Sequence, residues 1–215
     1  MDYSISLNEK QKILQRRISY NDLKKWNALS TLLATKELMD PRKSVCLGIN
    51  NISDEETFLK WIGVKNPHSF TVAEMLQTNV HPHFKCWLLF RQELTPPAVM
   101  GYWGLDMCRK ILLKTNTGNH DFRYSYLLQV KLAWLQNEAS LGNLMYATRK
   151  AKTIYEDCFM GGDERAKTEA YAVYAAMQED PFTSYRMLFE AMNRTAENPS
   201  EVYSDILQII ANSLQ

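Results

Sequence analysis

Residues that form turns are scarce in this chain. It contains 8 glycines and 7 prolines in 215 residues, about 7% against the roughly 12% of an average protein. A fold built from short strands needs a turn signal about every 8–12 residues, so this shortage disfavours an all-β protein. Helices joined by a few loops are favoured instead, and a chain of this length can bury a core of its own.

The N-terminal part of the chain shows helical spacing interrupted by one ambiguous segment. Apolar residues recur every three or four positions over 8–20 and 22–39, which predicts two amphipathic helices. Shorter helices are predicted over 53–63 and after Thr71, because both begin with the Ser/Thr-x-x-Glu spacing of a capping box. The segment SVCLGI, residues 44–49, fits either a short strand or an extended connector.

Proline and the apolar spacing define the remaining helices. Pro82 is favoured in a first helical turn, and the Thr95-Pro96-Pro97 sequence predicts an end near Leu94. The helices predicted beyond it, in antiparallel hairpins, are about 98–114, 121–137, 140–160, 163–178, 182–195 and 199–213. The apolar stripe expected on 121–137 consists of Phe122, Tyr126, Val130, Ala133 and Trp134.

Together these patterns predict an all-α fold of nine or ten helices in one compact helical domain, residues 1–215. Within it we expect an N-terminal helical hairpin (1–50), a segment of short helices (53–97) and a helical bundle (98–215). No repeat of 34 or 40 residues is present, so the solenoid signatures are not met.

The charge balance argues against nucleic acid as the main partner. Lys and Arg total 25 and Asp and Glu total 24, a formal charge of +1, whereas nucleic-acid binders usually carry a basic excess. Binding through basic helix faces at 10–25 and 149–152 remains an alternative.

The chain is expected to be cytoplasmic. The N-terminal residues lack the apolar core of a signal peptide, and no apolar run is long enough to span a bilayer. The four cysteines, at 46, 86, 108 and 158, form no CxxC pair. We expect them to be reduced and mostly buried.

One segment has the composition of a metal site. In NVHPHFKCW the candidate ligands His81, His83 and Cys86 lie close together in sequence, and zinc takes imidazole and thiolate ligands. The spacing matches no common zinc site, however, and Pro82 makes the start of a helix the simpler interpretation. The sequence therefore predicts no metal ion here.

Other chemical motifs are absent from the sequence. There is no glycine-rich phosphate loop, GxSxG, HExxH or EF-hand pattern. His120–Asp121 precedes a helix, and Asp121 is explained as a first-turn carboxylate at the positive helix end. We therefore predict no catalytic residue and no cofactor. An enzyme with a site near residues 79–120 is the alternative.

Eleven tyrosines leave two interpretations open. Tyrosine and arginine are typical anchors of protein interfaces, because they bury a large area at low entropic cost. The candidate partner-binding residues are Tyr155, Tyr171, Tyr174, Tyr185 and Arg149. The same tyrosines could instead belong to the core.

The segments CWLLFRQEL, AVMGYWGLDMCRKIL, LAW and RAKTEAYAVYAAM begin at Cys86 and follow one another within the block of about residues 87–193. In this order they resemble the all-helical immunity proteins of bacterial toxin and competition systems. The resemblance implies a non-catalytic cytosolic protein that neutralises a toxin or effector protein by covering it. It carries over no functional residue.

Overall fold

The computed structural model describes residues 5–26, 62–63, 69–115, 122–161, 163–196 and 198–214. In these residues it contains ten helices and one pair of short strands, so the predicted all-α fold is confirmed. The chain divides into two compact units. One comprises Ile5–Leu94 with Leu214, and the other comprises Thr95–Ser213. The prediction of a single domain stays a prediction.

The N-terminal unit is built around a strand pair that the helical spacing did not predict. Its elements are α1 (Leu7–Leu14), β1 (Arg17–Ser19), α2 (Tyr20–Lys25), β2 (Ser69–Thr71), α6 (Val72–Leu76) and α7 (Pro82–Leu89). The strands are antiparallel, and Ile18 pairs with Phe70. Both side chains are buried.

The helix predicted over 8–20 is therefore wrong beyond α1. Burial of Ile18 against a distant strand outweighs the local helical pattern, because strand formation depends on tertiary partners. Each strand then leads directly into a capped helix. Ser19 and Asp22 form the capping box of α2, and Thr71 and Glu74 form that of α6.

Other N-terminal predictions have mixed outcomes. The predicted start at Pro82 is confirmed, since Pro82 is the first residue of α7. The helix stops at Leu89 and not at Leu94, because residues 90–94 turn away from helical geometry. The possible strand at 44–49 and nearly all of the helix at 53–63 lie outside the described residues. Gly63 itself is described and has a φ of 81°, a left-handed conformation that suits glycine after a helix.

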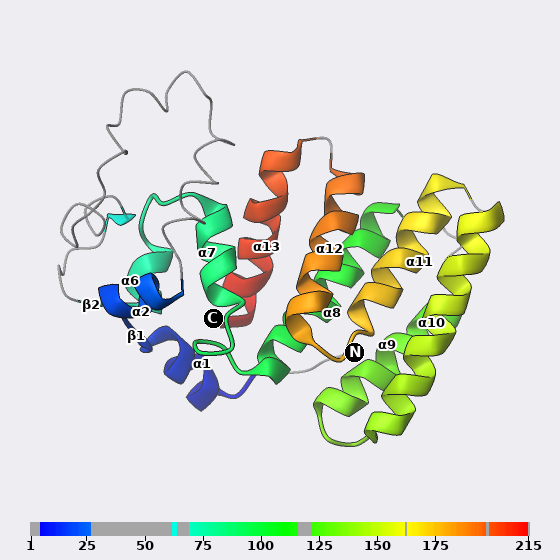
Figure 1. The fold of residues 1–215 in the computed structure, drawn as a ribbon, viewed down its shortest axis with the longest axis horizontal. Helices are drawn as coiled ribbons and strands as arrows, with labels where there is room; N and C mark the ends of the chain where they lie inside the picture. The colour runs from blue at the N-terminus through cyan, green and yellow to red at the C-terminus, as the bar shows by residue number, and fades with distance from the viewer. Residues whose placement is uncertain are drawn as a thin grey trace. The chain divides into compact units, whose positions relative to one another are not determined.

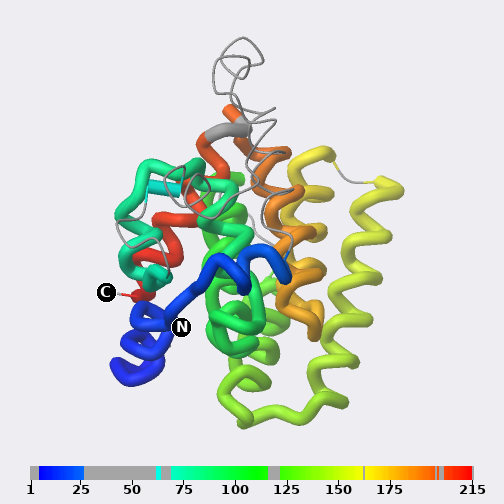
Figure 2. The backbone as a smooth tube through the Cα atoms, turned by 60° about the vertical axis from the view of Figure 1, so that its left-hand side comes forward, coloured from blue at the N-terminus to red at the C-terminus, as the bar shows by residue number. Residues whose placement is uncertain are grey.

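The described part of the C-terminal unit contains six helices. Its helices are α8 (Pro97–Thr115), α9 (Phe122–Leu135), α10 (Leu141–Gly161), α11 (Glu164–Ala176), α12 (Pro181–Thr195) and α13 (Pro199–Leu214). Helices α10, α11 and α12 lie side by side (Figures 1 and 2). Helix α11 also contacts α8 and α9, which places it at the centre of the packing. Its buried alanines allow this close approach.

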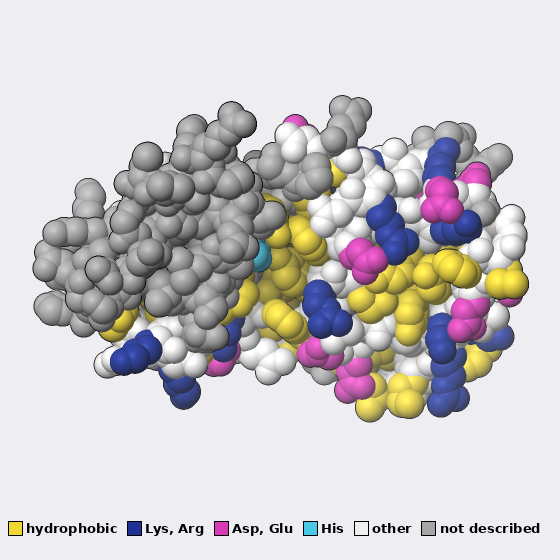
Figure 3. All heavy atoms as spheres, turned by 45° about the horizontal axis from the view of Figure 1, so that its top comes forward, with side chains coloured by type: hydrophobic (Ala, Val, Ile, Leu, Met, Phe, Trp, Pro, Cys, Tyr) yellow, Lys and Arg dark blue, Asp and Glu magenta, His cyan; other side chains and the backbone are white. Residues whose placement is uncertain are grey.

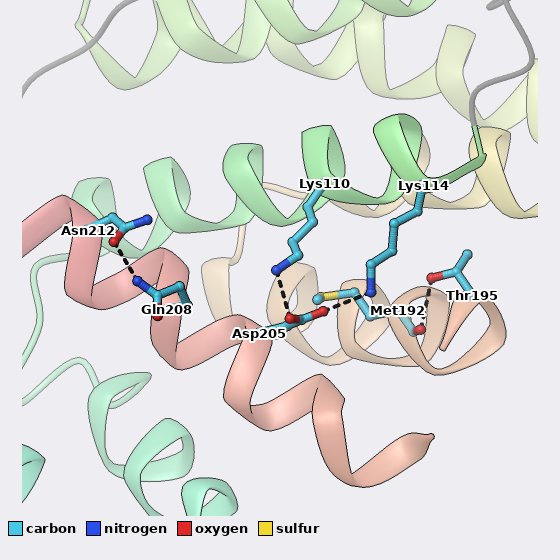
Figure 4. A network of polar contacts seen from close by, with 7 residues as sticks. All are labelled: Lys110, Lys114, Met192, Thr195, Asp205, Gln208 and Asn212. Atoms are coloured by element: carbon cyan, nitrogen blue, oxygen red, sulfur yellow. Dashed lines mark hydrogen bonds and ion pairs between the residues drawn. The ribbon is translucent and has the colours of Figure 1, made fainter. Parts of the chain in front are cut away.

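Polar contacts join helix α13 to α8 at two places along their length. The indole N–H of Trp103 donates to the hydroxyl of Ser213 at 2.6 Å. Two turns further along α8, the ammonium groups of Lys110 and Lys114 both lie 2.8 Å from the carboxylate of Asp205 (Figure 4). The two helices are therefore antiparallel.

The predicted stripe on α9 is wrong. Phe122 and Tyr126 are exposed, while the buried face carries Tyr124, Leu127, Leu128, Lys131, Leu132 and Leu135. The large aromatic residues were expected inside because of their apolar area. The structure instead buries the aliphatic stem of Lys131, whose ammonium group has polar partners, and leaves those two rings in solvent.

Candidate functional site

The histidine-rich segment forms a helix cap. The Nδ1 atom of His81 accepts a hydrogen bond from the backbone N–H of His83 at 3.1 Å, and Pro82 occupies the first helical position. Burial lowers the pKa of both histidines, which favours their neutral rings. The Nδ1 lone pair of His81, which could bind a metal, is thus occupied by the hydrogen bond that caps the helix.

The buried thiols are held in their protonated form. Cys86 is fully buried, and this burial raises its pKa far above the ordinary range of a thiol. Burial also raises the pKa of Cys108 to about 12. A thiolate is the form that binds metals or acts as a nucleophile, so neither residue is prepared for that chemistry. Among the residues that the structure describes, no group of three His, Cys, Asp or Glu side chains could hold a metal ion.

Three of the predicted tyrosines lie together where α10 packs against α11. The ring of Tyr155 is 5.3 Å from that of Tyr171 and 6.1 Å from that of Tyr174, nearly parallel to the latter. All three are half-buried. Aromatic pairs at such distances stabilise one another beyond the area they bury, so the rings are held in place from both helices.

The antiparallel packing of the two helices explains this meeting. Tyr171 and Tyr174 are three residues apart and lie on one face of α11. At the other end of the contact, the hydroxyl of Thr148 on α10 donates to the carbonyl oxygen of Met177 at 2.9 Å. Met177 directly follows the last residue of α11. Its bond to Thr148 therefore fixes the register that brings Tyr155 opposite the tyrosines of α11.

Charged side chains cover two of the neighbouring rings. The guanidinium of Arg194 lies 4.8 Å from the ring centre of Tyr171, and the ammonium of Lys167 lies 5.8 Å from that of Phe159. Both distances fall within the range of cation–π attraction. The ring of Phe159 is 6.1 Å from that of Tyr155, so the aromatic contacts continue towards the end of α10.

A polar network orients Tyr171. Its hydroxyl donates to Oε2 of Glu190 at 2.8 Å, while Nη2 of Arg194 donates to Oε1 of the same carboxylate at 2.6 Å. Burial and the bond to Glu190 raise the pKa of Tyr171 to about 12. The bonds from Tyr171 and Arg194 lower the pKa of Glu190. At neutral pH the phenol is thus neutral and its acceptor is ionised.

We call this set of residues the aromatic surface: Tyr155, Phe159, Tyr171 and Tyr174, with Lys167 and Arg194 over the rings. Phe159 is 60% exposed and the adjacent Met160 is 86% exposed. Figure 3 shows hydrophobic side chains gathered in a band among charged ones over the part of the C-terminal unit where α10 and α11 lie. Apolar groups that are exposed together in this way mark interaction sites more often than isolated ones do.

The other two candidates lie elsewhere. Tyr185 is buried in α12, where its ring contacts those of Phe182 and Phe189, so the structure places it in the core. Arg149 is exposed on α10. The sequence interpretation missed Phe159, Lys167, Glu190 and Arg194. Two signals were available, since Phe159 follows Tyr155 by one helical turn and Glu190–Arg194 is an i,i+4 ion pair.

Comparison with known proteins identified no relative of this chain. No protein-family model, curated protein or solved structure matches this chain. Among the described residues, none of the helices has both the length and the hydrophobicity needed to cross a membrane.

Proposed function

We propose that this protein acts without catalysis by binding another protein through the aromatic surface. The observation that carries the proposal is the contact between Tyr155, Tyr171 and Tyr174 next to the exposed Phe159. Tyrosine and arginine are enriched among residues that dominate binding energy. Rings already fixed by their neighbours lose less entropy when a partner covers them.

The interpretation of these rings as ordinary core accounts for only part of the surface. Half-buried tyrosines between two helices are common in helical bundles. The exposure of Phe159 and Met160 has no such explanation, because both leave large apolar area in water. A partner that covered them would recover that area.

The bound protein in this proposal is a toxin or effector that the chain neutralises by covering it in the cytoplasm. This finer part rests on the family resemblance of residues 87–193. It predicts that the bound protein harms a cell when produced alone and that co-production of this chain removes the harm. Unchanged toxicity on co-production would contradict this part of the proposal.

Photo-crosslinking in the native cell tests the binding surface. We expect a photoreactive phenylalanine at position 159 to capture one defined protein, because the side chain is exposed within the proposed interface. Tyr126 on α9 is the matched control position, since it is aromatic and also 60% exposed. Equal capture from both positions, or capture of no protein from position 159, would contradict the proposed surface.

A further inference from the structure

A second feature of the C-terminal unit is a polar cavity of about 600 Å³. It lies where the last turns of α8 and α12 meet the first turn of α11. Its lining includes three cations, one from each helix: Lys114, Arg165 and Arg194. Glu164 is the carboxylate in the same lining. The volume is within the range of small-molecule sites, about 300–1,000 Å³.

The fold by itself explains the presence of two of these cations. Lys114 and Arg194 belong to the last turns of their helices, where a positive charge complements the helix dipole. Each also has a carboxylate partner, Asp205 for Lys114 and Glu190 for Arg194. Asp205, however, is shared with Lys110. One negative charge therefore faces two positive ones, as Figure 4 shows.

Arg165 is not explained in this way. It lies in the first turn of α11, where the helix dipole disfavours a cation. Its ion pair with Glu169 is long, 3.5 Å from Nε to Oε1, and has arginine N-terminal to glutamate, the less favourable order. The two terminal amino groups of the guanidinium lie outside this pair. A positive group at such a position, beside two further cations, fits a site that receives an anion.

Three threonines give the cavity a second kind of hydrogen-bonding group. The hydroxyls of Thr115, Thr168 and Thr195 each donate to a backbone carbonyl of their own helix, at 2.8–3.2 Å. All three side chains line the cavity, and Thr195 of α12 lies beside Lys114 in Figure 4. Because each hydroxyl proton is already used, its oxygen can only accept a hydrogen bond from a ligand.

We infer that this cavity binds a small hydroxylated anion of the sugar-phosphate class. The phosphate group would face the terminal amino groups of Arg165, which bind oxyanions in a two-pronged arrangement. Lys114 and Arg194 would contribute further positive charge. Hydroxyl groups of the sugar would donate to the threonine oxygens. Arg194 belongs to both the cavity and the aromatic surface, but Arg165 and Lys114 belong to the cavity alone, so variants at these two residues test the cavity apart from the proposed function.

Calorimetric titration of the full-length protein at low ionic strength tests the inference, with ribose phosphate as the probe. We expect saturable binding of ribose phosphate, weaker binding of inorganic phosphate and no binding of ribose. Ribose lacks the charge that the arginine requires, and inorganic phosphate lacks the sugar hydroxyls. Added salt should weaken the binding, because exposed charge pairs are screened.

Variants locate the binding. Arg165→Gln should weaken the binding of ribose phosphate about tenfold or more, since one charge-assisted contact is lost. Lys114→Gln should also weaken it, and provides a second variant if Arg165→Gln reduces stability. Arg149→Gln, on the exposed face of α10, should have no effect. Absence of saturable binding, or equal losses in Arg165→Gln and Arg149→Gln, would overturn the site.

Discussion

Lys131 shows how this fold accommodates a buried charge. The side chain is 2% exposed, and its ammonium group donates to the carbonyl oxygen of Gln178 at 2.6 Å, just beyond α11. It also lies 4.4 Å from the ring centre of Trp134. Burial lowers the pKa of Lys131 to about 8, although the nearby charges of Glu179 and Asp180 act in the opposite direction. Desolvation of the ammonium group is therefore the larger effect.

This pKa predicts a specific pH dependence of stability. Between about pH 8 and the ordinary lysine value of 10.5, the unfolded chain binds the proton more tightly than the folded chain. The contribution of Lys131 to the free energy of unfolding should therefore rise with pH in this window, by about 3 kcal/mol in total. Lys131→Met should abolish the rise. Urea denaturation of both proteins at pH 7.5 and at pH 10 measures the difference.

Other groups that titrate in the same window cancel when the variant is compared with the wild-type protein. Lys150→Met, on the exposed face of α10, is the control and should follow the wild-type pH dependence. If Lys131→Met and the wild-type protein changed in parallel between the two pH values, the buried ammonium would not be the cause.

Single residues were predictable where their role is local. Pro82 at a helix start and the Thr71 capping box of α6 follow from the chain next to them. The burial of Lys131 and the exposure of Phe122 do not, because both depend on which face of α9 meets its neighbours. Periodicity identifies a helix, and a lysine with a long apolar stem can then occupy a face that a simple count of apolar residues assigns to solvent.

At the scale of elements, the approach of α8 to α9 depends on one glycine. A Cβ atom at Gly101 would lie 2.5 Å from Cδ2 and 3.1 Å from Cδ1 of Leu135, which is itself buried. Glycine costs an α-helix about 1 kcal/mol relative to alanine. The close contact between these helices therefore explains the glycine in the interior of α8.

Gly101→Ala should lower the free energy of unfolding by about 1 kcal/mol. Overpacking against Leu135 costs about 1–3 kcal/mol, and the gain in helix propensity offsets about 1 kcal/mol of that cost. Gly142→Ala is the matched substitution in α10, where the nearest atom to a Cβ would be 3.6 Å away, and it should cause no loss. Chemical denaturation measures both. If the Gly101→Ala and Gly142→Ala proteins were equally stable, α8 and α9 could move apart at little cost in free energy, which would contradict this account of Gly101.

Helix ends were easier to predict than strand pairs. The end of α9 is closed by Asn137, which has a φ of 60°. The N–H of Glu138 bonds to the carbonyl of Ala133, as in a Schellman motif. Such signals lie within a few residues of the helix. The pairing of Ile18 with Phe70 joins segments that are far apart in the sequence. The residues next to either strand carry no signal that predicts this pairing.

At the scale of the whole molecule, the sequence predicted the helical class but not the site as a set. Tyr155 and Tyr171 were candidates, yet their meeting depends on the register between α10 and α11. The same holds for Arg194, which reaches Tyr171 from α12. A surface assembled from three helices has no contiguous motif, and this is why Tyr185 could not be separated from the others before the packing was known.

The affinity for the captured partner protein measures how much the aromatic surface contributes to binding. Phe159→Ala should raise the dissociation constant about tenfold or more, because an exposed ring within the aromatic surface would be a main anchor of the complex. Tyr126→Ala removes an equally exposed ring from α9 and should leave the constant unchanged. Equal affinities for the two variants would contradict binding through this surface.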